Sequence, residues 1–154
     1  MYDVLKVVNW LRVRNNLELR LDDNAEELTQ FKAMKLLYYI QGTSLAYLKQ
    51  RFFPQDIIAI ADGPFIKKVY AKYRTKRVIV GTITDNDMAD YEELLKDPDC
   101  ATVLNAVYDA FGHRSTYDLL WNIQTESPWE NTKLGKKITD DEMLKYFKTA
   151  IEVQ

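Results

Sequence analysis

The sequence contains a single cysteine and a single histidine among its 154 residues, and each scarcity excludes a class of site. Cys100 has no second cysteine with which to form a disulfide, which favours a reducing compartment. Together with His113 it supplies too few ligands for a conventional zinc site. We therefore expect a cytoplasmic protein without a bound metal or other cofactor.

Long apolar runs and a strong charge excess are also lacking. No stretch approaches the roughly 18 apolar residues that a membrane span requires, so we expect no membrane association. The net charge of −2 gives no general reason to expect binding to nucleic acid. With 47% hydrophobic and 29% charged residues, the composition is typical of a globular protein. The length predicts a single domain over residues 1–154.

Catalytic and nucleotide-binding motifs are missing as well. There is no phosphate-binding glycine loop, no dinucleotide fingerprint, no Gly-x-Ser-x-Gly and no His-Glu-x-x-His. Asp85-Asn86-Asp87 begins like a calcium loop, but the required glycine and distal glutamate are not in place. His113 could act as a general base, although a histidine beside the helix-ending Gly112 is also a common surface residue. The sequence thus predicts a protein that is not an enzyme.

Helical periodicity is the strongest pattern that the sequence does contain. The spacing predicts a helix over residues 2–14 that ends at Asn15-Asn16, followed by a short extended segment or loop. Thr29 is placed to cap a second helix, which Phe53-Pro54 ends. Apolar residues on most sides of this helix predict a buried central position. Gly42 within it indicates the close approach of another element.

The pattern in the rest of the chain also predicts mainly helices. Capping residues precede apolar periodicity at Thr84, Asp97, Ser115 and Thr139. Two β-rich runs, residues 57–60 and 78–83, are predicted to pair as a short ribbon. The predicted fold class is mainly α: a compact single-domain bundle of about six to seven helices.

A short acidic and glycine-proline stretch separates an apolar run from a basic segment. Gly63 suits a helix N-cap, and Pro64 suits the first helical position because its φ is preset and no N–H is lost. Asp62, just upstream, is placed to favour the positive end of the helix dipole. We therefore interpret this stretch as the start of a helix.

The basic segment, residues 67–77, combines lysines and arginines with tyrosines. Its members are Lys67, Lys68, Tyr70, Lys72, Tyr73, Arg74, Lys76 and Arg77. Phosphate contacts with stacking aromatics are typical of single-stranded nucleic-acid binding. The alternative is a solvated or protein-binding helix face whose Tyr73 packs inward. An acidic run over residues 85–99 could balance its charge.

Two adjacent tyrosines, Tyr38 and Tyr39, also have two interpretations. Adjacent residues lie 100° apart around a helix, so both are buried only if that helix is central. They either pack in the core with a hydrogen-bond partner for each hydroxyl or line a ligand pocket.

Several stretches, in this order, resemble one family. Residues 28–42 look like an opening helix of the type L-T-N-L-K-L-Q-K-L-L-Y-Y-A-Q-G; residues 62–70 are similar to a G-P-V…V-Y segment; residues 111–119 look like a Y-G…S…E-L segment; residues 127–129 resemble a P-W element. The matching positions, which we expect to be structural, are Lys35, Leu36, Leu37, Tyr38, Tyr39, Gln41, Gly42, Asp62, Gly63, Pro64, Pro128 and Trp129.

The family that carries these motifs is the Panacea-domain, or SocA-like, antitoxins, also known as phage-associated proteins. The resemblance covers about residues 3–150. It implies a small cytoplasmic protein that binds and neutralises a toxin encoded beside it, or that delivers the toxin to a protease. The family often has Thr-His before Pro-Trp, whereas this chain has Ile123-Gln124, so a role for that histidine does not carry over.

The partner-binding face is expected on the basic helix. The candidate residues are Lys67, Lys68, Tyr70, Lys72, Tyr73 and Arg74. Tyrosine and arginine are frequent anchors at protein interfaces. A nucleic-acid-binding regulator that uses residues 67–77 is the alternative function.

Overall fold

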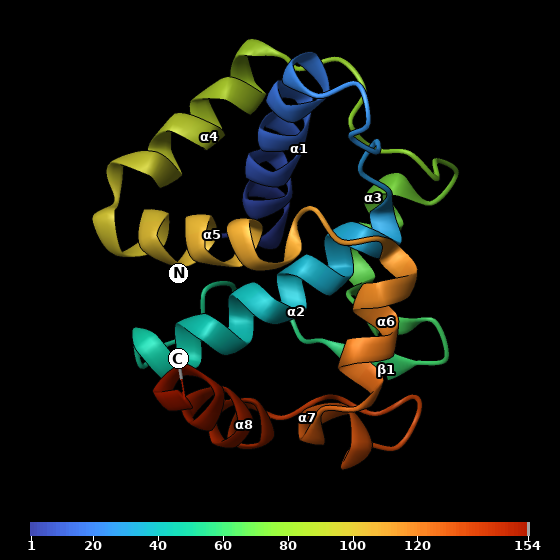
Figure 1. The fold of residues 1–154 in the computed structure, drawn as a ribbon, viewed down its shortest axis with the longest axis vertical. Coiled ribbons are helices and arrows are strands. Elements are labelled where there is room, and N and C mark those ends of the chain that lie inside the picture. Colours follow the sequence, from blue (N-terminus) through green and yellow to red (C-terminus); the bar gives the residue numbers. More distant parts are fainter. Residues whose placement is uncertain (154) are drawn as a thin grey trace.

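A computed structural model describes the backbone of residues 1–153 and the side chains of residues 1–150. Within this range the chain forms eight helices and one two-stranded antiparallel sheet (Figure 1). The elements are α1 (Val4–Leu21), α2 (Gln30–Tyr47), β1 (Ile58–Ile60), β2 (Gly63–Phe65), α3 (Lys67–Tyr73), α4 (Asp85–Lys96), α5 (Pro98–Phe111), α6 (Thr116–Gln124), α7 (Ser127–Glu130) and α8 (Asp140–Val153). The predicted, mainly helical fold class is confirmed. The helix count is slightly higher than predicted because α7 is a single turn, too short to show periodicity.

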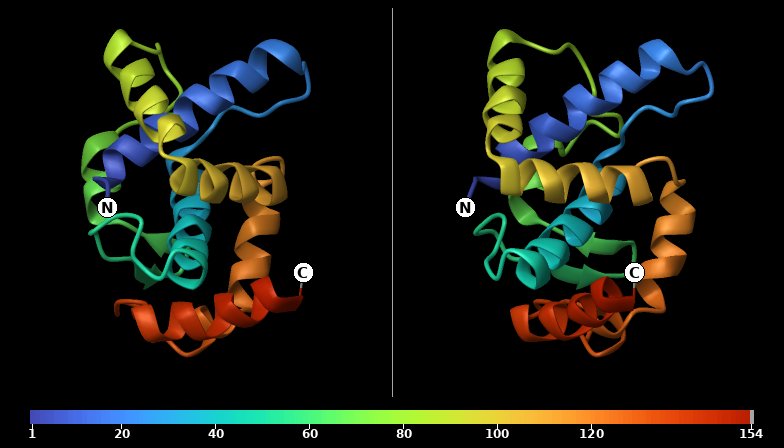
Figure 2. Two further views of the ribbon diagram at one scale, coloured as in Figure 1. Left: turned by 90° about the vertical axis from the view of Figure 1, so that its left-hand side faces the viewer. Right: turned by 60° about the vertical axis from the view of Figure 1, so that its left-hand side comes forward.

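Helix α2 runs through the centre of the molecule. Helices α1 and α5 pack on one side of it, and α8 and the sheet pack on the other (Figures 1 and 2). Its side chains are buried on nearly every face, as the apolar pattern predicted. The Thr29 hydroxyl accepts a hydrogen bond from the Lys32 N–H at 3.2 Å, which confirms the predicted N-cap.

Helix α2 ends at Tyr47, so the predicted end at Phe53-Pro54 is wrong. The chain instead turns at Lys49, which has a φ of 62°, and folds back along the helix. There the Gln41 side chain accepts hydrogen bonds from the Phe52 and Phe53 N–H groups and donates one to the Phe53 carbonyl. A buried side chain has thus taken over the backbone pairing that a longer helix would have supplied.

Helix α1 continues to Leu21, so the predicted end at Asn15-Asn16 is also wrong. The Asn15 side chain is buried and bridges the backbone of the following connection. It donates to the Glu26 carbonyl and accepts from the Leu28 N–H, both at 2.9 Å. Asparagine often ends a helix because its side chain competes for local backbone groups, but here those groups are distant ones.

Strand β1 pairs with β2, with Ile60 opposite Gly63, and not with residues 78–83 as predicted. Residues 61–62 make the turn, and Gly63 has a φ of 119°, which side-chain-bearing residues rarely adopt. The predicted helix start at Gly63-Pro64 is therefore wrong: α3 begins at Lys67, with Ile66 as its N-cap.

Residues 78–83 follow an irregular path held by a buried arginine. Arg12 of α1 donates to the carbonyls of Ile79, Val80 and Thr82 at 2.7–3.1 Å. One isolated bridge joins Val78 to Thr29. Within this run Ile79 and Val80 are buried in the core, so these two β-branched residues serve packing and not strand pairing.

The other predicted N-caps are confirmed. Each capping oxygen accepts a hydrogen bond from a first-turn N–H: Thr84 from Asp87, Asp97 from Cys100, Ser115 from Asp118, and Thr139 from Glu142. At α4 the Asp87 carboxylate also accepts from the Thr84 N–H and completes a capping box.

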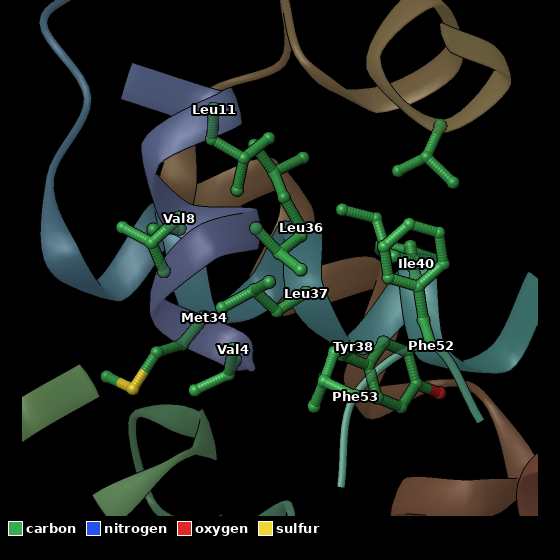
Figure 3. Packing of buried hydrophobic residues seen from close by; sticks show 14 of the residues in the cluster. Val4, Val8, Leu11, Met34, Leu36, Leu37, Tyr38, Ile40, Phe52 and Phe53 are labelled. Carbon is green, nitrogen blue, oxygen red and sulfur yellow. The ribbon is translucent and has the colours of Figure 1, made fainter. Parts of the chain in front are cut away.

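One continuous apolar core joins α1, α2 and the helices around them. In Figure 3 the Leu11 side chain of α1 lies close to Leu36 of α2. Burial of apolar surface stabilises the fold by about 25 cal/mol per Å² removed from water. Gly42 confirms the predicted close approach, because a side chain there would collide with the Phe147 ring of α8.

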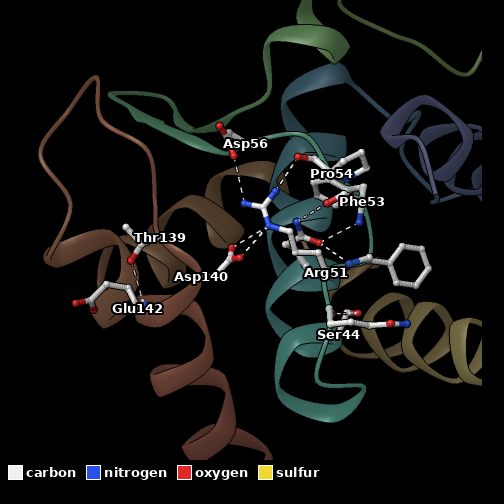
Figure 4. A network of polar contacts seen from close by, with 11 residues as sticks. Ser44, Arg51, Phe53, Pro54, Asp56, Thr139, Asp140 and Glu142 are labelled. Carbon is white, nitrogen blue, oxygen red and sulfur yellow. Dashed lines mark hydrogen bonds and ion pairs between the residues drawn. The ribbon is translucent and has the colours of Figure 1, made fainter. Parts of the chain in front are cut away.

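The start of α8 is tied to the connection after α2 by Arg51 (Figure 4). Its Nε donates to both carboxylate oxygens of Asp140 at 3.0 Å, and its Nη1 donates to the Pro54 carbonyl at 2.7 Å. Asp140, in the first turn of α8, also suits the positive end of the helix dipole. These contacts set the position of α8 alongside α2.

Candidate functional site

The basic helix α3 presents most of its predicted site residues to solvent. Lys67, Lys68, Lys72 and Arg74 are exposed. Tyr70 is half-buried against the Phe65 ring, with 5.1 Å between ring centroids. Tyr73 belongs to the buried core, as the inward-packing alternative predicted. The structure therefore brings the basic residues to one surface and places Tyr73 beneath it.

The acidic run on α4 is paired with α1 and not with the basic segment. Lys6 lies 2.9 Å from Glu93, and Arg12 lies 3.0 Å from Asp87. Lys68 pairs with Asp3 at the start of α1. Within the described range, Lys67, Lys72 and Arg74 take part in no ion pair, so their charge stays available at the surface.

The Arg12–Asp87 pair is largely buried. Burial alone would raise the pKa of Asp87, but hydrogen bonds from Thr84 and Arg12 together with the Arg12 charge lower it below its usual value. Arg12 is also saturated by backbone carbonyls. Because its N–H donors all bind groups within the fold, we interpret this pair as structural.

Lys35 lies under the β1–β2 hairpin and is 1% exposed. Its Nζ donates to the Asp62 carbonyl at 2.8 Å, and a side chain at Gly63 would press against it. Burial lowers the pKa of Lys35 to about 8, and the Asp62 charge opposes that shift. The family-motif positions Lys35, Asp62 and Gly63 thus form one contact that orients the hairpin over α2.

The two adjacent tyrosines of α2 converge on one carboxylate. The hydroxyls of Tyr38 and Tyr39 each donate to a different oxygen of Glu126, both at 2.9 Å. The Tyr146 hydroxyl of α8 also acts on this carboxyl and lowers its pKa. Glu126 is 8% exposed and sits at the N-cap of α7, just before Ser127-Pro128.

Sequence reasoning missed Glu126. The available signal was its place directly before the Ser127-Pro128-Trp129 motif, since a proline near the first helical position marks the preceding residues as a helix start. An acidic residue there suits the helix dipole. Nothing local indicated that this carboxylate would meet Tyr38 and Tyr39, which precede it by 88 and 87 residues.

The environment of Glu126 disfavours its charge. Burial raises the pKa of its carboxyl, although hydrogen bonds from Tyr39, Tyr38 and Tyr146 and the charge of Arg114 act in the opposite direction. Burial and the neighbouring carboxylate raise the pKa of Tyr146 to about 12, so this hydroxyl remains a donor at neutral pH. The cluster is a buried acid surrounded by neutral hydroxyls.

Glu126 lines an open cavity of about 440 Å³. We call this cavity the Glu126 groove. Its lining residues are Tyr39, Thr43, Tyr47, Thr102, Val103, Ala106, Val107, Ala110, Phe111, Asn122, Glu126, Tyr146, Phe147 and Ala150. They come from α2, α5, α6 and α8 and the α6–α7 connection. Figure 1 shows α5 and α8 on opposite sides of the C-terminal half of α2, which contributes Tyr39, Thr43 and Tyr47 to the lining.

The remaining candidate positions lie apart from this groove's lining. His113 is exposed, with its Nδ1 3.4 Å from the Glu18 carboxylate. Ile123 is a core residue and Gln124 is exposed, so the departure from the family pattern puts an apolar side chain in the core. In residues 1–150 no cluster of His, Cys, Asp or Glu side chains is suited to hold a metal ion.

Comparison with known proteins identifies the family. The model of the SocA-like antitoxin, Panacea domain, matches residues 34–130, which include Tyr38, Gly63 and Glu126. No curated protein and no solved structure matches the chain. Along the described part of the chain, none of the helices combines the length and apolarity needed to span a bilayer. The chain belongs to the SocA-like, Panacea-domain family of antitoxins.

Proposed function

We propose that this protein neutralises a cognate protein toxin, encoded by a neighbouring gene, by binding it directly in the cytoplasm. The family match over residues 34–130 carries this proposal. The structure adds two surfaces that suit a protein partner, the Glu126 groove and the exposed face of α3. A reducing compartment suits a chain with one cysteine.

Direct neutralisation requires no catalysis by this chain. Binding can block the toxin's active surface, or it can deliver the toxin to a cytoplasmic protease. In the second mode the complex forms first, so both modes predict the same physical contact.

The test is co-expression of this protein with the product of the adjacent open reading frame. We expect the neighbour to arrest growth when expressed alone, growth to recover on co-expression, and a complex to co-purify. The His113→Ala variant is a matched control that should rescue growth equally well, since the proposal gives His113 no role. A toxic neighbour that is neither bound nor neutralised would contradict the proposal.

The two modes differ in what happens to the toxin. Blocking leaves its amount unchanged, whereas delivery to a protease shortens its half-life. A pulse-chase measurement with and without this protein separates them, and protease-deficient cells restore the half-life only in the delivery mode.

A second candidate function is nucleic-acid binding, which the exposed lysines of α3 favour. Counterion release makes such binding fall steeply with salt. A triple variant with Lys67→Glu, Lys68→Glu and Lys72→Glu should then abolish a gel shift seen at low salt. Absence of any shift for the wild-type protein at low salt removes this function.

A further inference from the structure

The Glu126 groove has the size of a binding site. Its volume of about 440 Å³ falls within the range of roughly 300–1,000 Å³ typical of ligand pockets. Most of its lining is apolar, with Phe111, Phe147 and Val107 among the contributors. Such a space accommodates a few apolar side chains of a partner and removes their surface from water.

One wall of the groove is open to the close approach of another chain. Thr102, Ala106 and Ala110 follow one another at four-residue spacing, so they lie on one face of α5. All three are small and exposed, although they border an apolar cavity. Tyr47, 54% exposed, lies at the end of α2 that borders the same cavity.

The groove also contains a charge that the fold leaves without an ion pair. Each Glu126 oxygen accepts a hydrogen bond from a tyrosine hydroxyl, and the charge of Arg114 also favours the ionised carboxyl, but among the described residues no lysine, arginine or histidine forms an ion pair with it. A carboxylate has about four acceptor sites, so the Glu126 carboxylate retains accepting capacity beyond these two hydrogen bonds. Burying an ionised group without a directly paired counter-charge is unfavourable, and a cation brought by a partner would offset that cost.

A lysine or arginine side chain suits both the apolar lining of the groove and the Glu126 carboxylate. Its aliphatic stem can lie along apolar walls while its charged end reaches the carboxylate. A phosphate or an acidic side chain would instead be repelled by Glu126. The chemistry therefore selects a basic residue carried on an apolar segment.

We propose that the Glu126 groove is the docking site for an apolar segment of the toxin that carries a lysine or arginine, whose cation pairs with Glu126. This rests on the function proposed above and assigns its principal interface. The exposed basic face of α3 then has no more than a peripheral part in toxin binding.

The first experiment fills the groove from its exposed wall. Ala106→Trp and Ala110→Trp place bulk in the groove without disturbing a buried residue, and we expect them to weaken toxin binding by at least about 100-fold. The matched control is Ala71→Trp, on the exposed surface of α3, which should bind like the wild type. Binding is measured by titration calorimetry with the purified toxin, and circular dichroism verifies the fold.

The second experiment removes the charge alone. We expect Glu126→Gln to weaken binding by roughly 30-fold or more, because a buried charge pair loses one partner. Glu130→Gln, the same change at an exposed acidic residue four positions later, is the control and should leave binding unchanged.

A double-mutant cycle identifies the partner cation. Each lysine and arginine of the toxin is changed to methionine, and every variant is measured against wild-type protein and Glu126→Gln. At one toxin position, the change to methionine should strongly weaken binding to the wild-type protein and hardly affect binding to the Glu126→Gln variant. Additive effects at every position would contradict the charge pairing.

The outcomes separate this inference from the proposed function. A complex that Ala106→Trp and Ala110→Trp leave intact overturns the groove assignment but not the antitoxin function. A loss of binding confined to Ala71→Trp places the interface on α3 instead. A wild-type dimer that the groove variants dissociate without weakening toxin binding shows that a second copy occupies the groove. Absence of any complex with wild type overturns both proposals.

Discussion

Acidic side chains have different partners in two regions of this molecule. Between α1 and α4, acidic residues meet basic ones: Arg12 contacts Asp87 and Lys6 contacts Glu93. In the Glu126 groove, the buried carboxylate meets tyrosine hydroxyls. Between α1 and α4 the charged groups named above pair with one another inside the fold. In the groove, Glu126 is an acid that a cation from a partner can still neutralise.

This difference shows why charge density alone is a poor guide to a binding site. The acidic run over residues 85–99 is prominent in the sequence, yet three of its carboxylates, those of Asp87, Asp90 and Glu93, are held by α1. Glu126 is a single acid in an unremarkable stretch, yet its burial raises its pKa and its cavity is open. Perturbed acids beside a cavity are better candidates for function than exposed charge runs.

The largest expected effect comes from breaking the paired region. Arg12→Ala should lower the free energy of unfolding by about 3 kcal/mol or more, because Asp87 is left buried without its counter-charge. Three backbone carbonyls lose their donor at the same time. Urea denaturation measures the change. Lys6→Ala breaks a more exposed pair and should lower the free energy of unfolding by less than about 1 kcal/mol. Equal losses of stability in the two variants would contradict the expected difference between a buried and an exposed ion pair.

A slightly smaller effect is expected on the groove side. Gly42→Ala should destabilise the protein by about 1–3 kcal/mol, since the new methyl group collides with the Phe147 ring and forces α8 away from α2. Thr43→Ala, the next residue along, should stay within about 0.5 kcal/mol of wild type. Thermal or urea unfolding tests both. If Gly42→Ala leaves the free energy of unfolding unchanged, α8 can shift without cost.

Lys35 should contribute a rise in stability with pH. Its folded pKa is about 8 and its usual value is 10.5, so between these values the unfolded state binds more protons. The free energy of unfolding should therefore increase from pH 8 to pH 10.5. Lys35→Met should lack this increase. The difference between the two proteins, measured by urea denaturation across this range, isolates Lys35 from other groups that titrate there.

The smallest stability effect should come from Glu126. Its folded pKa lies above the usual 4.5, so the folded state binds more protons in the interval between the two values. The free energy of unfolding should fall as pH rises through that interval, and Glu126→Gln should lack the fall. A wild-type stability that instead rises more steeply than that of the variant would show that the hydrogen bonds and the Arg114 charge outweigh burial at Glu126.

Much of the fold could be predicted because its signals are local. The N-cap at Thr29 and the capping box at Thr84 require only residues within one helical turn. The central position of α2 follows from an apolar pattern on most of its faces. Gly42 indicated a close neighbour but could not identify it as Phe147, more than a hundred residues later in the chain.

Two of the wrong predictions share one physical cause. Asn15 ends helices in general, but here its amide bonds to Glu26 and Leu28 and α1 continues. The β-rich residues 78–83 lack a strand partner because Arg12 holds their carbonyls. In each case a distant side chain satisfied backbone groups that local propensity would have assigned elsewhere.

By itself, the sequence determined the fold class, the buried central helix and the family, since these depend on local periodicity and on motifs read in order. Only the tertiary structure decided which charges are paired and which are left over. Tyr38 and Tyr39 had two interpretations until α7 placed Glu126 within hydrogen-bond distance of both. Burial and pairing are properties of residues distant in the chain, so the groove exists only once α2, α5, α6 and α8 have packed together.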